Sequence, residues 1–156
     1  MNPPNGMPEV VSFYGDNRVT ELSKGSCAGD PAWEHDNLIV LKNVCGTGKA
    51  IQIHHALSSL FQSCLSAAIA SAPRYEISML GGYCARHQRN DPNLPLSIHS
   101  YGAAFDLNWN ANPMGKRLVT DIPIDFVRAF TSKGWVWGGD WSSIKDPMHF
   151  QFATGC

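Results

Sequence analysis

The sequence predicts an α+β domain, because hydrophobic residues recur with two different periods in separate stretches of the chain. Residues 56–70 carry apolar side chains at three- and four-residue steps, which is the stripe of an amphipathic helix. Short runs rich in branched and aromatic residues predict strands at 38–41, 51–53, 76–80, 103–108 and 149–152. No internal repeat or low-complexity tract is visible, so we predict one domain over residues 1–156.

The composition is that of a folded protein with little electrostatic bias. Hydrophobic residues make up 44% of the chain and charged residues 16%, which is typical of a globular protein. The net charge of -1 gives no electrostatic case for binding nucleic acid or an anionic membrane. No apolar run approaches the ~18 residues of a membrane span. We therefore expect neither a nucleic-acid partner nor insertion into a membrane.

The first 36 residues are rich in Pro, Gly and polar side chains, and 10–14 is their only apolar cluster. This composition predicts that 1–36 is an irregular arm packed on the domain. The chain begins Met-Asn-Pro-Pro-Asn-Gly and shows no basic and apolar regions of a signal peptide. We expect that the protein starts in a cytoplasm or that the sequence begins after processing.

A hairpin and the first long helix are expected next. A turn at 46–48 would allow 38–41 and 51–53 to pair. In the helix, Cys64 lies on the apolar stripe and is most simply a small buried hydrophobic residue. His54 and His55 precede this helix, and surface or capping roles are favoured over metal binding for both.

A second helix is predicted to open at 121–125 and to stop at Gly134. Trp135 and Trp137 follow, and strand alternation puts both on one face. At least one tryptophan of this region, which also contains Trp141, is expected in the core, while another could line a groove. The side chains expected to face inward from the helix are Ile124, Val127, Ala129 and Phe130.

Three potential metal ligands occur in two stretches, 97–106 and 146–149. Two histidines and one carboxylate are the ligands of a catalytic zinc site that keeps one position open, so we assign zinc to His99, Asp106 and His149. Gly102 permits a tight turn after the first histidine. Alternation along the two strands puts Asp106 and His149 on the sides opposite their neighbouring phenylalanines.

Asp146 is predicted to be the general base. It precedes His149 by three residues, and Pro147 keeps it out of a helical conformation, so a short turn can bring both residues round one ion. A metal with an uncoordinated carboxylate beside it is sufficient to activate water. Iron could also occupy a site of two histidines and one carboxylate. Asp146, as a fourth group that can activate water, favours zinc over iron.

At these residues the chain resembles a family of zinc peptidases. The pattern S-x-H-x-x-G-x-A-x-D, followed by D-x-x-H-F, is similar to D-Ala-D-Ala carboxypeptidases and L-Ala-D-Glu endopeptidases. This family includes VanY-type enzymes and many phage endolysins, and it shares a core with the Hedgehog signalling domain. The resemblance runs from about Gly81 to Phe152 and includes 134–141. It implies a Hedgehog/DD-peptidase-like fold, in which an antiparallel sheet carries the zinc site and helices pack on one side.

The resemblance also implies roles for residues around the metal. The family's metal ligands and catalytic carboxylate match the four residues assigned above. Its substrate-binding arginine, shortly before the first histidine, matches Arg86 best and Arg89 second. A fixed guanidinium there would stabilise an oxyanion as it forms. Further substrate-binding residues are expected at Ser97, Arg89, Tyr101 and Trp137.

The function implied by the resemblance is zinc-dependent hydrolysis of the stem peptide of bacterial peptidoglycan. The bond would be L-Ala-D-Glu or a terminal D-Ala-D-Ala. A small chain with no visible signal peptide suits a phage endolysin, made in the host cytoplasm and released through membrane holes formed by a holin. We expect it to be a monomer that acts on the bacterial cell wall.

Two other functions remain open from the sequence. One is a non-catalytic, zinc-stabilised binding module, which the Hedgehog kinship permits. The other is a Cys-His hydrolase using Cys84 and His87, although no recognisable motif surrounds them. The cysteines show no C-x-x-C spacing, so a zinc finger is not indicated, and the sequence does not pair them into disulfides: Cys27, Cys45, Cys64, Cys84 and Cys156.

Overall fold

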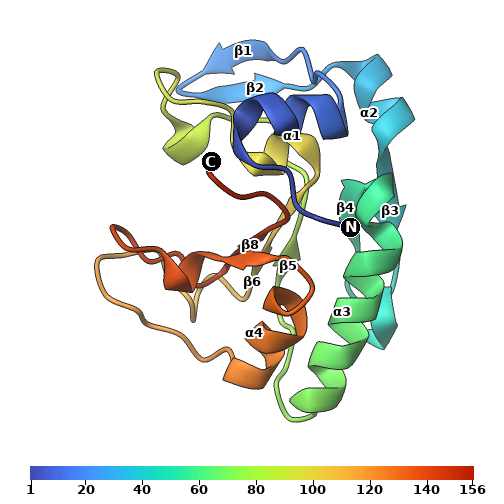
Figure 1. Cartoon of the computed structure of the whole chain (residues 1–156), viewed down its shortest axis with the longest axis vertical. Helices are drawn as coiled ribbons and strands as arrows, with labels where there is room; N and C mark the ends of the chain where they lie inside the picture. The colour runs from blue at the N-terminus through green and yellow to red at the C-terminus, as the bar shows by residue number, and fades with distance from the viewer.

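The computed structural model describes residues 1–156 and has the mixed α+β architecture that the sequence predicts (Figure 1). No helix is long and apolar enough to cross a bilayer. The helices are α1 (Gly6–Tyr14), α2 (Pro31–Asn37), α3 (Ser58–Ser71) and α4 (Ile124–Thr131). The strands are β1 (Thr20–Ser23), β2 (Ser26–Ala28), β3 (Leu38–Leu41), β4 (Ile51–His54), β5 (Leu80–Gly81), β6 (Ala104–Leu107), β7 (Val136–Trp137) and β8 (His149–Gln151).

The largest sheet has four antiparallel strands in the order β5-β6-β8-β7. In its register Phe105 lies opposite Phe150, and Asp106 lies opposite His149. Because side chains alternate along a strand, this register gives the sheet one aromatic face and one polar face. The two phenylalanine rings stack with their centroids 4.9 Å apart. Two of the three predicted metal ligands therefore meet on the opposite face.

Helices α3 and α4 cover the aromatic face of this sheet (Figure 1). Phe61 of α3 and Phe130 of α4 lie with their ring centroids 5.1 and 4.9 Å from that of Phe105. The predicted apolar stripe of α3 is confirmed, and Cys64 on it is only 2% exposed. The core behind the sheet is thus built largely from aromatic rings, which bury more area per residue than aliphatic side chains.

The prediction for α4 is correct for Val127 and Phe130 but wrong for Ile124. Ile124 is 53% exposed, whereas Phe126 is buried to 1% exposure. A helix turns by roughly 100° per residue, so a stripe centred on Phe126, Val127 and Phe130 leaves Ile124 on another side. Ala129 lies at the edge of the stripe and is partly buried against the core.

The prediction of an irregular arm over 1–36 is wrong, because this segment contains α1, the β1–β2 hairpin and α2. Helix α1 is tied to the sheet: the Tyr14 hydroxyl donates to the Phe152 carbonyl over 2.8 Å, and Val10 is fully buried. Helix α2 begins after Asp30, whose carboxylate accepts hydrogen bonds from two backbone N–H groups, with Pro31 at the first helical position. The N-terminal part is therefore folded structure with its own caps and buried contacts.

The predicted hairpin of β3 and β4 is confirmed. The capping role predicted for His54 is also confirmed, since its Nδ1 atom accepts a hydrogen bond from the Ala56 N–H over 3.1 Å. His54 is 3% exposed, and burial lowers its pKa to about 4. Its neighbour His55 is exposed and stacks on it.

Only the end of the strand predicted at 76–80 forms, as β5. Upstream of it, the side chain of Asn108 takes the place of a neighbouring strand. Its oxygen accepts from the N–H groups of Ser78 and Met79, both over 2.9 Å, and its amide donates to the Glu76 carbonyl over 2.7 Å. Asn108 itself has φ +45°, so the alternation predicted for 103–108 stops at the end of β6.

Candidate metal centre

The structure brings His99, Asp106 and His149 together on the polar face of the sheet. The His99 Nε2 atom lies 3.1 Å from His149 Nδ1 and 3.2 Å from Asp106 Oδ1, and the third side of this triangle is 3.1 Å. In a tetrahedral zinc site, bonds of about 2.0–2.1 Å hold the ligand atoms roughly 3.3 Å apart. The donor set and its spacing therefore fit a zinc ion, with one coordination position left for a non-protein ligand.

Local structure explains how each ligand reaches the triangle. Asp106 and His149 are a cross-strand pair of β6 and β8. His99 lies on a short 3₁₀ helix, Ile98–Tyr101, and its own N–H donates to the Ser97 hydroxyl that caps this helix. Gly102 ends this helix at φ +62°, and a Cβ there would lie 2.6 Å from the backbone nitrogen of His54. Only glycine fits this turn, which joins the metal cluster to the β3–β4 hairpin.

The remaining ring nitrogens of both histidines are held by carbonyl oxygens. His99 Nδ1 lies 2.7 Å from the Gly82 carbonyl, which can only accept, so this nitrogen carries the proton. His149 Nε2 lies 3.0 Å from Gln151 Oε1, while the Gln151 amide donates to the Ala153 carbonyl. Both rings thus turn their second nitrogen towards Asp106, where it can share a proton with the carboxylate or bind a metal ion. Such partners orient ligating histidines in metal sites.

Electrostatics within the triangle favour an ionised carboxylate. Burial alone would raise the pKa of Asp106, but hydrogen bonds from His149 and His99, together with their charges, hold it well below its usual range. Burial lowers the pKa of His149, and the stronger effects of Asp106 and Gln151 leave it raised. A divalent cation would take the place of the proton that these three side chains otherwise share.

Asp146 lies beside this triangle but is not part of it. Its ligand atoms are outside the group that lies within 4.8 Å. The Asp146 carbonyl accepts from the His149 N–H over 3.0 Å, which is the short turn predicted from the sequence. Its Oδ1 atom is buried without a hydrogen-bond partner in the protein. Burial raises the pKa of Asp146, although the charges of His149 and Arg86 act in the opposite direction.

Asp146 is positioned by close packing against Gly138. The Asp146 N–H donates to the Gly138 carbonyl over 3.0 Å. A Cβ at Gly138 would lie 2.4 Å from the Asp146 carbonyl oxygen and 3.0 Å from the Asp146 Cβ. Any larger residue at position 138 would push the Asp146 backbone away, so this glycine has a direct role in the placement of the carboxylate.

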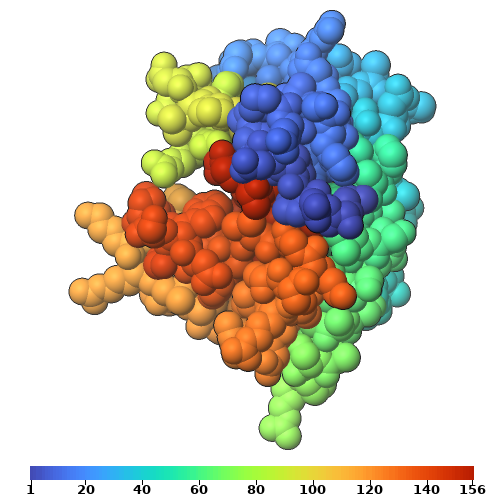
Figure 2. Space-filling view, viewed as in Figure 1, coloured from blue at the N-terminus to red at the C-terminus, as the bar shows by residue number.

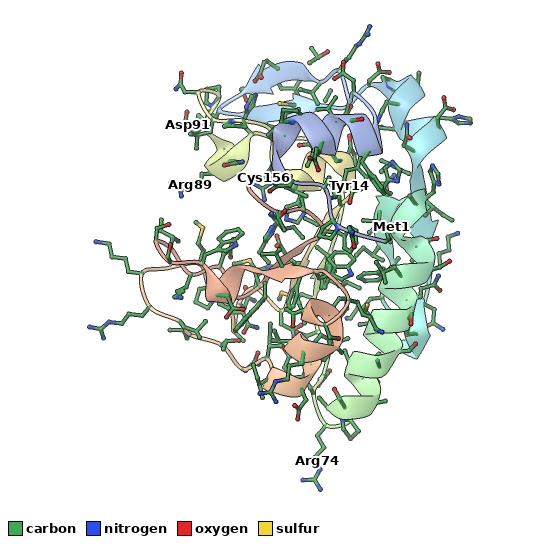
Figure 3. The ribbon with its side chains drawn as sticks, in the orientation of Figure 1. Met1, Tyr14, Arg74, Arg89, Asp91 and Cys156 are labelled. Carbon is green, nitrogen blue, oxygen red and sulfur yellow. The ribbon has the colours of Figure 1, made fainter.

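The metal cluster lies in an open groove of about 700 Å³. Figure 2 shows the hollow between two lobes, one formed around residues 86–95 and the other by the chain around 135–148, with the C-terminus at its inner end. Arg86 and Arg89 line the first lobe, and Figure 3 shows Arg89 at its margin. Trp141 lines the second, and its ring centroid is 5.3 Å from that of His149. Two cations and one aromatic ring thus line the groove that contains the cluster.

Two of the predicted substrate-binding residues do not reach the groove. Tyr101 is 2% exposed and packs edge-on against Trp33. Trp137 is 5% exposed, stacks on Phe150 and donates its indole N–H to the Pro147 carbonyl. Both face the core because the elements that carry them turn their other side to the groove. Trp141, four residues after Trp137, lines the groove in its place.

Ser97 lines the groove, but its hydroxyl also caps the helix of His99.

The pairing of Cys84 with His87 is not supported, because Cys84 is exposed while the ring nitrogens of His87 contact Glu21 and the Leu94 carbonyl. All five cysteines are free thiols in the structure.

Residues 90–152 match a protein-family model described as D-alanyl-D-alanine carboxypeptidase. The matched segment contains the three residues of the triangle and Asp146, but it begins after Arg86 and Arg89. The match supports the resemblance to this peptidase family for the part of the chain that carries the candidate metal centre. No solved structure gives a significant match to the chain.

Proposed function

We propose that this protein is a zinc-dependent peptidase that cleaves the stem peptide of bacterial peptidoglycan, at an L-Ala-D-Glu or a terminal D-Ala-D-Ala bond. The observation that carries the proposal is the triangle of His99, Asp106 and His149, with the unpartnered carboxylate of Asp146 beside it in an open groove. The family match to a carboxypeptidase supplies the substrate class.

His99, Asp106 and His149 would hold the zinc ion in this proposal. Bound zinc lowers the pKa of water from about 15.7 to about 7 and polarises a carbonyl group. The protein's contribution is to fix the two imidazole rings, which it does through the carbonyl oxygens of Gly82 and Gln151. Rings held in this way do not have to reorient when a substrate binds.

Asp146 would act as the general base and then as the general acid. It takes a proton from the attacking water and delivers it to the leaving amine. The raised pKa that burial gives this carboxyl favours both steps, because a base with a pKa nearer neutrality also returns its proton more readily. Its Oδ1 atom has no hydrogen-bond partner in the protein that would compete for that proton.

Arg86 and Arg89 would bind the negative charges of the substrate. We assign Arg86, whose charge acts on Asp146, to the oxyanion that develops at the scissile carbonyl. Arg89 lies at the exposed margin of the groove, where it can pair with a carboxylate of the stem peptide. The indole of Trp141 offers an apolar surface for the small side chains of such a peptide.

The biological setting in this proposal is the bacterial cell wall, where the substrate occurs. The motif resemblance includes phage endolysins, and it supports a role as a lysin that reaches the wall through holin-formed holes. Lysis of producing bacteria only after their membrane has been permeabilised would support this setting. A non-catalytic zinc module would give no reason for the Asp146 carboxylate beside the metal ligands, whose Oδ1 atom is buried without a hydrogen-bond partner.

The test is digestion of purified peptidoglycan by the zinc-loaded protein, with mass spectrometry of the fragments. Loss of single D-Ala residues identifies a carboxypeptidase, and release of stem peptides that begin with D-Glu identifies the endopeptidase. The Asp146→Asn variant is the matched control, because it keeps the metal ligands. If the folded, zinc-loaded protein leaves the peptidoglycan fragments the same as in an untreated sample, the proposed activity is ruled out and the non-catalytic binding module remains.

A further inference from the structure

A second cluster of metal-ligating side chains lies away from the groove, on the N-terminal hairpin. Glu21, Cys27 and His87 each offer one ligand atom, and these three atoms lie within 4.8 Å of one another. The Glu21 carboxylate contacts His87 Nε2. Cys27 is 8% exposed, and its sulfur makes a long contact of 3.9 Å with the Gly25 carbonyl. Neither the family match nor the proposed peptidase mechanism uses these residues.

Backbone pairing brings the three side chains together. Glu21 of β1 lies opposite Cys27 of β2. On the other side of β2, the Cys27 N–H donates to the Ala85 carbonyl over 3.1 Å, and the His87 N–H donates to the Gly25 carbonyl over 2.8 Å. The hairpin and the chain at 85–87 thus form a ribbon, and Figure 1 shows β1 and β2 lying along this segment.

The alternation of side chains along this ribbon separates two functions. Cys27 and His87 point to one face of the ribbon, where Glu21 meets them. Arg86, the residue before His87, points to the other face and lines the groove. The segment that presents Arg86 to a substrate is therefore held from behind by His87.

His87 is oriented in the same way as His99 in the first cluster. Its Nδ1 atom is hydrogen-bonded to the Leu94 carbonyl, which can only accept, so Nδ1 carries a proton and Nε2 faces Glu21 and Cys27. The equivalent partner of His99 is the Gly82 carbonyl. A carbonyl that fixes the far nitrogen is the usual support of a ligating histidine.

We propose that Glu21, Cys27 and His87 form a second metal site, which takes a divalent cation of intermediate softness such as Zn²⁺. A thiolate, an imidazole and a carboxylate are all zinc ligands. The two anionic ligands neutralise the charge of the ion. Because the Glu21 side chain is 56% exposed, the remaining coordination position faces solvent and can be filled by water.

An ion in this site would join parts of the chain that are 66 residues apart, as Glu21 and His87 are. Cross-links that close long loops stabilise a fold by restricting its unfolded chain. The ion would also fix the lobe that carries Arg86. Its role is therefore structural, and it is distinct from the ion that the groove would hold.

Titration of the metal-free protein with Co²⁺ tests this site, because a thiolate ligand gives cobalt a charge-transfer absorption in the near ultraviolet. The groove cluster contains no sulfur, so it cannot give this band. We expect the band in the wild-type protein and in His149→Ala. We expect its loss in Cys27→Ser and its retention in Cys84→Ser, which removes a neighbouring exposed thiol.

Glu21→Gln provides a second variant that does not disturb the core, since this side chain is mostly exposed. It should keep the band but weaken cobalt binding on the order of 10-fold or more, as the loss of a supporting partner already costs that much. The proposal is overturned if the wild-type protein shows no band, if the band survives in Cys27→Ser, or if Glu21→Gln binds cobalt as tightly as wild type.

Discussion

The C-terminal part of the molecule, residues 86–152, and the N-terminal part, residues 1–57, contribute in different ways. The C-terminal part contains the metal triangle and Asp146, on short strands and tight turns. The N-terminal part supplies helix α1 and the β3–β4 hairpin, which bind the C-terminal part through the Tyr14 hydroxyl on the Phe152 carbonyl and the His54 N–H on the Gly102 carbonyl. The comparison indicates that the first part determines the chemistry and the second holds it in place.

This difference has a physical origin. A catalytic side chain must be held within a fraction of an ångström, and cross-strand pairs and glycine turns provide such precision over a few residues. Stability, in contrast, accumulates over many buried contacts that need no particular chemistry. Changes in the C-terminal part should therefore alter metal binding or turnover in a folded protein, and changes in the N-terminal part should alter stability. The following predictions test this division in order of decreasing effect.

The largest effect is expected from His149→Ala, which removes a predicted zinc ligand. Zinc affinity should fall by more than the roughly 10–100-fold that is lost with a hydrogen-bonded partner of a ligand. Peptidase activity should disappear, and the melting temperature should drop because metal binding is coupled to folding. Elemental analysis measures the bound zinc, and calorimetry measures the melting temperature. His55→Ala, at an exposed position, is the control. A zinc content in His149→Ala equal to that of the parent protein would exclude His149 from the site.

The next effect is expected from Asp146→Asn, which keeps the size of the side chain but removes the base. Turnover should fall by ~10² to 10⁴-fold, the usual contribution of a positioned general base. Zinc content and melting temperature should stay close to those of the parent, because Asp146 lies outside the triangle. Loss of zinc in this variant would instead make Asp146 a fourth ligand.

Arg86→Ala should lower turnover by on the order of 10²-fold or more, as expected when a donor to an oxyanion is removed. The fold and the zinc content should not change. Arg128→Ala is a suitable control, because Arg128 lies exposed on α4 and pairs only with Asp125. Loss of activity in Arg89→Ala but not in Arg86→Ala would transfer the oxyanion role to Arg89.

In the N-terminal part, Tyr14→Phe should reduce stability without changing turnover. The variant leaves the buried carbonyl of Phe152 without the Tyr14 hydroxyl, which costs about 1–3 kcal/mol. Denaturant unfolding measures this loss, and assays at temperatures well below the transition should give parental rates. A fall in turnover without a fall in stability would break the division between the two parts.

The smallest effect concerns acid stability and His54. The folded pKa of about 4 lies below the unfolded value of about 6.5, so neutral His54 contributes stability that is present above pH 6.5. This contribution declines as the pH falls towards 4. His54→Gln should therefore flatten the loss of melting temperature over this range, whereas His55→Gln at the exposed neighbour should not. If the melting temperature falls with pH equally steeply in His54→Gln and His55→Gln, the assignment to His54 is contradicted.

The metal centre was predictable because its signals are local. His99, Gly102 and Asp106 lie within one short stretch, and Asp146 lies three residues before His149. Strand alternation then correctly assigned the polar and aromatic faces. The capping signal of α2 was present as well, in Asp30 followed by Pro31, although the overall richness in Pro and Gly favoured an irregular arm.

Tertiary structure decided which aromatic residues face the groove. The sequence predicted Trp137 as a groove residue, but the register of β7 with β8 turns Trp137 onto Phe150, and Trp141 lines the groove instead. Likewise, no local pattern shows that Asn108 would bind the backbone of 76–79 in place of a strand. These outcomes depend on partners far away in the chain.

The sequence by itself determined the α+β class, the hairpin, the long helix and the candidate metal ligands, because periodicity and motif spacing are properties of neighbouring residues. Only the tertiary structure decided that Gly138 supports Asp146 and that Cys27 meets His87. The physical reason is that a contact between distant segments depends on how strands pair and where side chains pack. Such pairings are selected by the free energy of the whole fold.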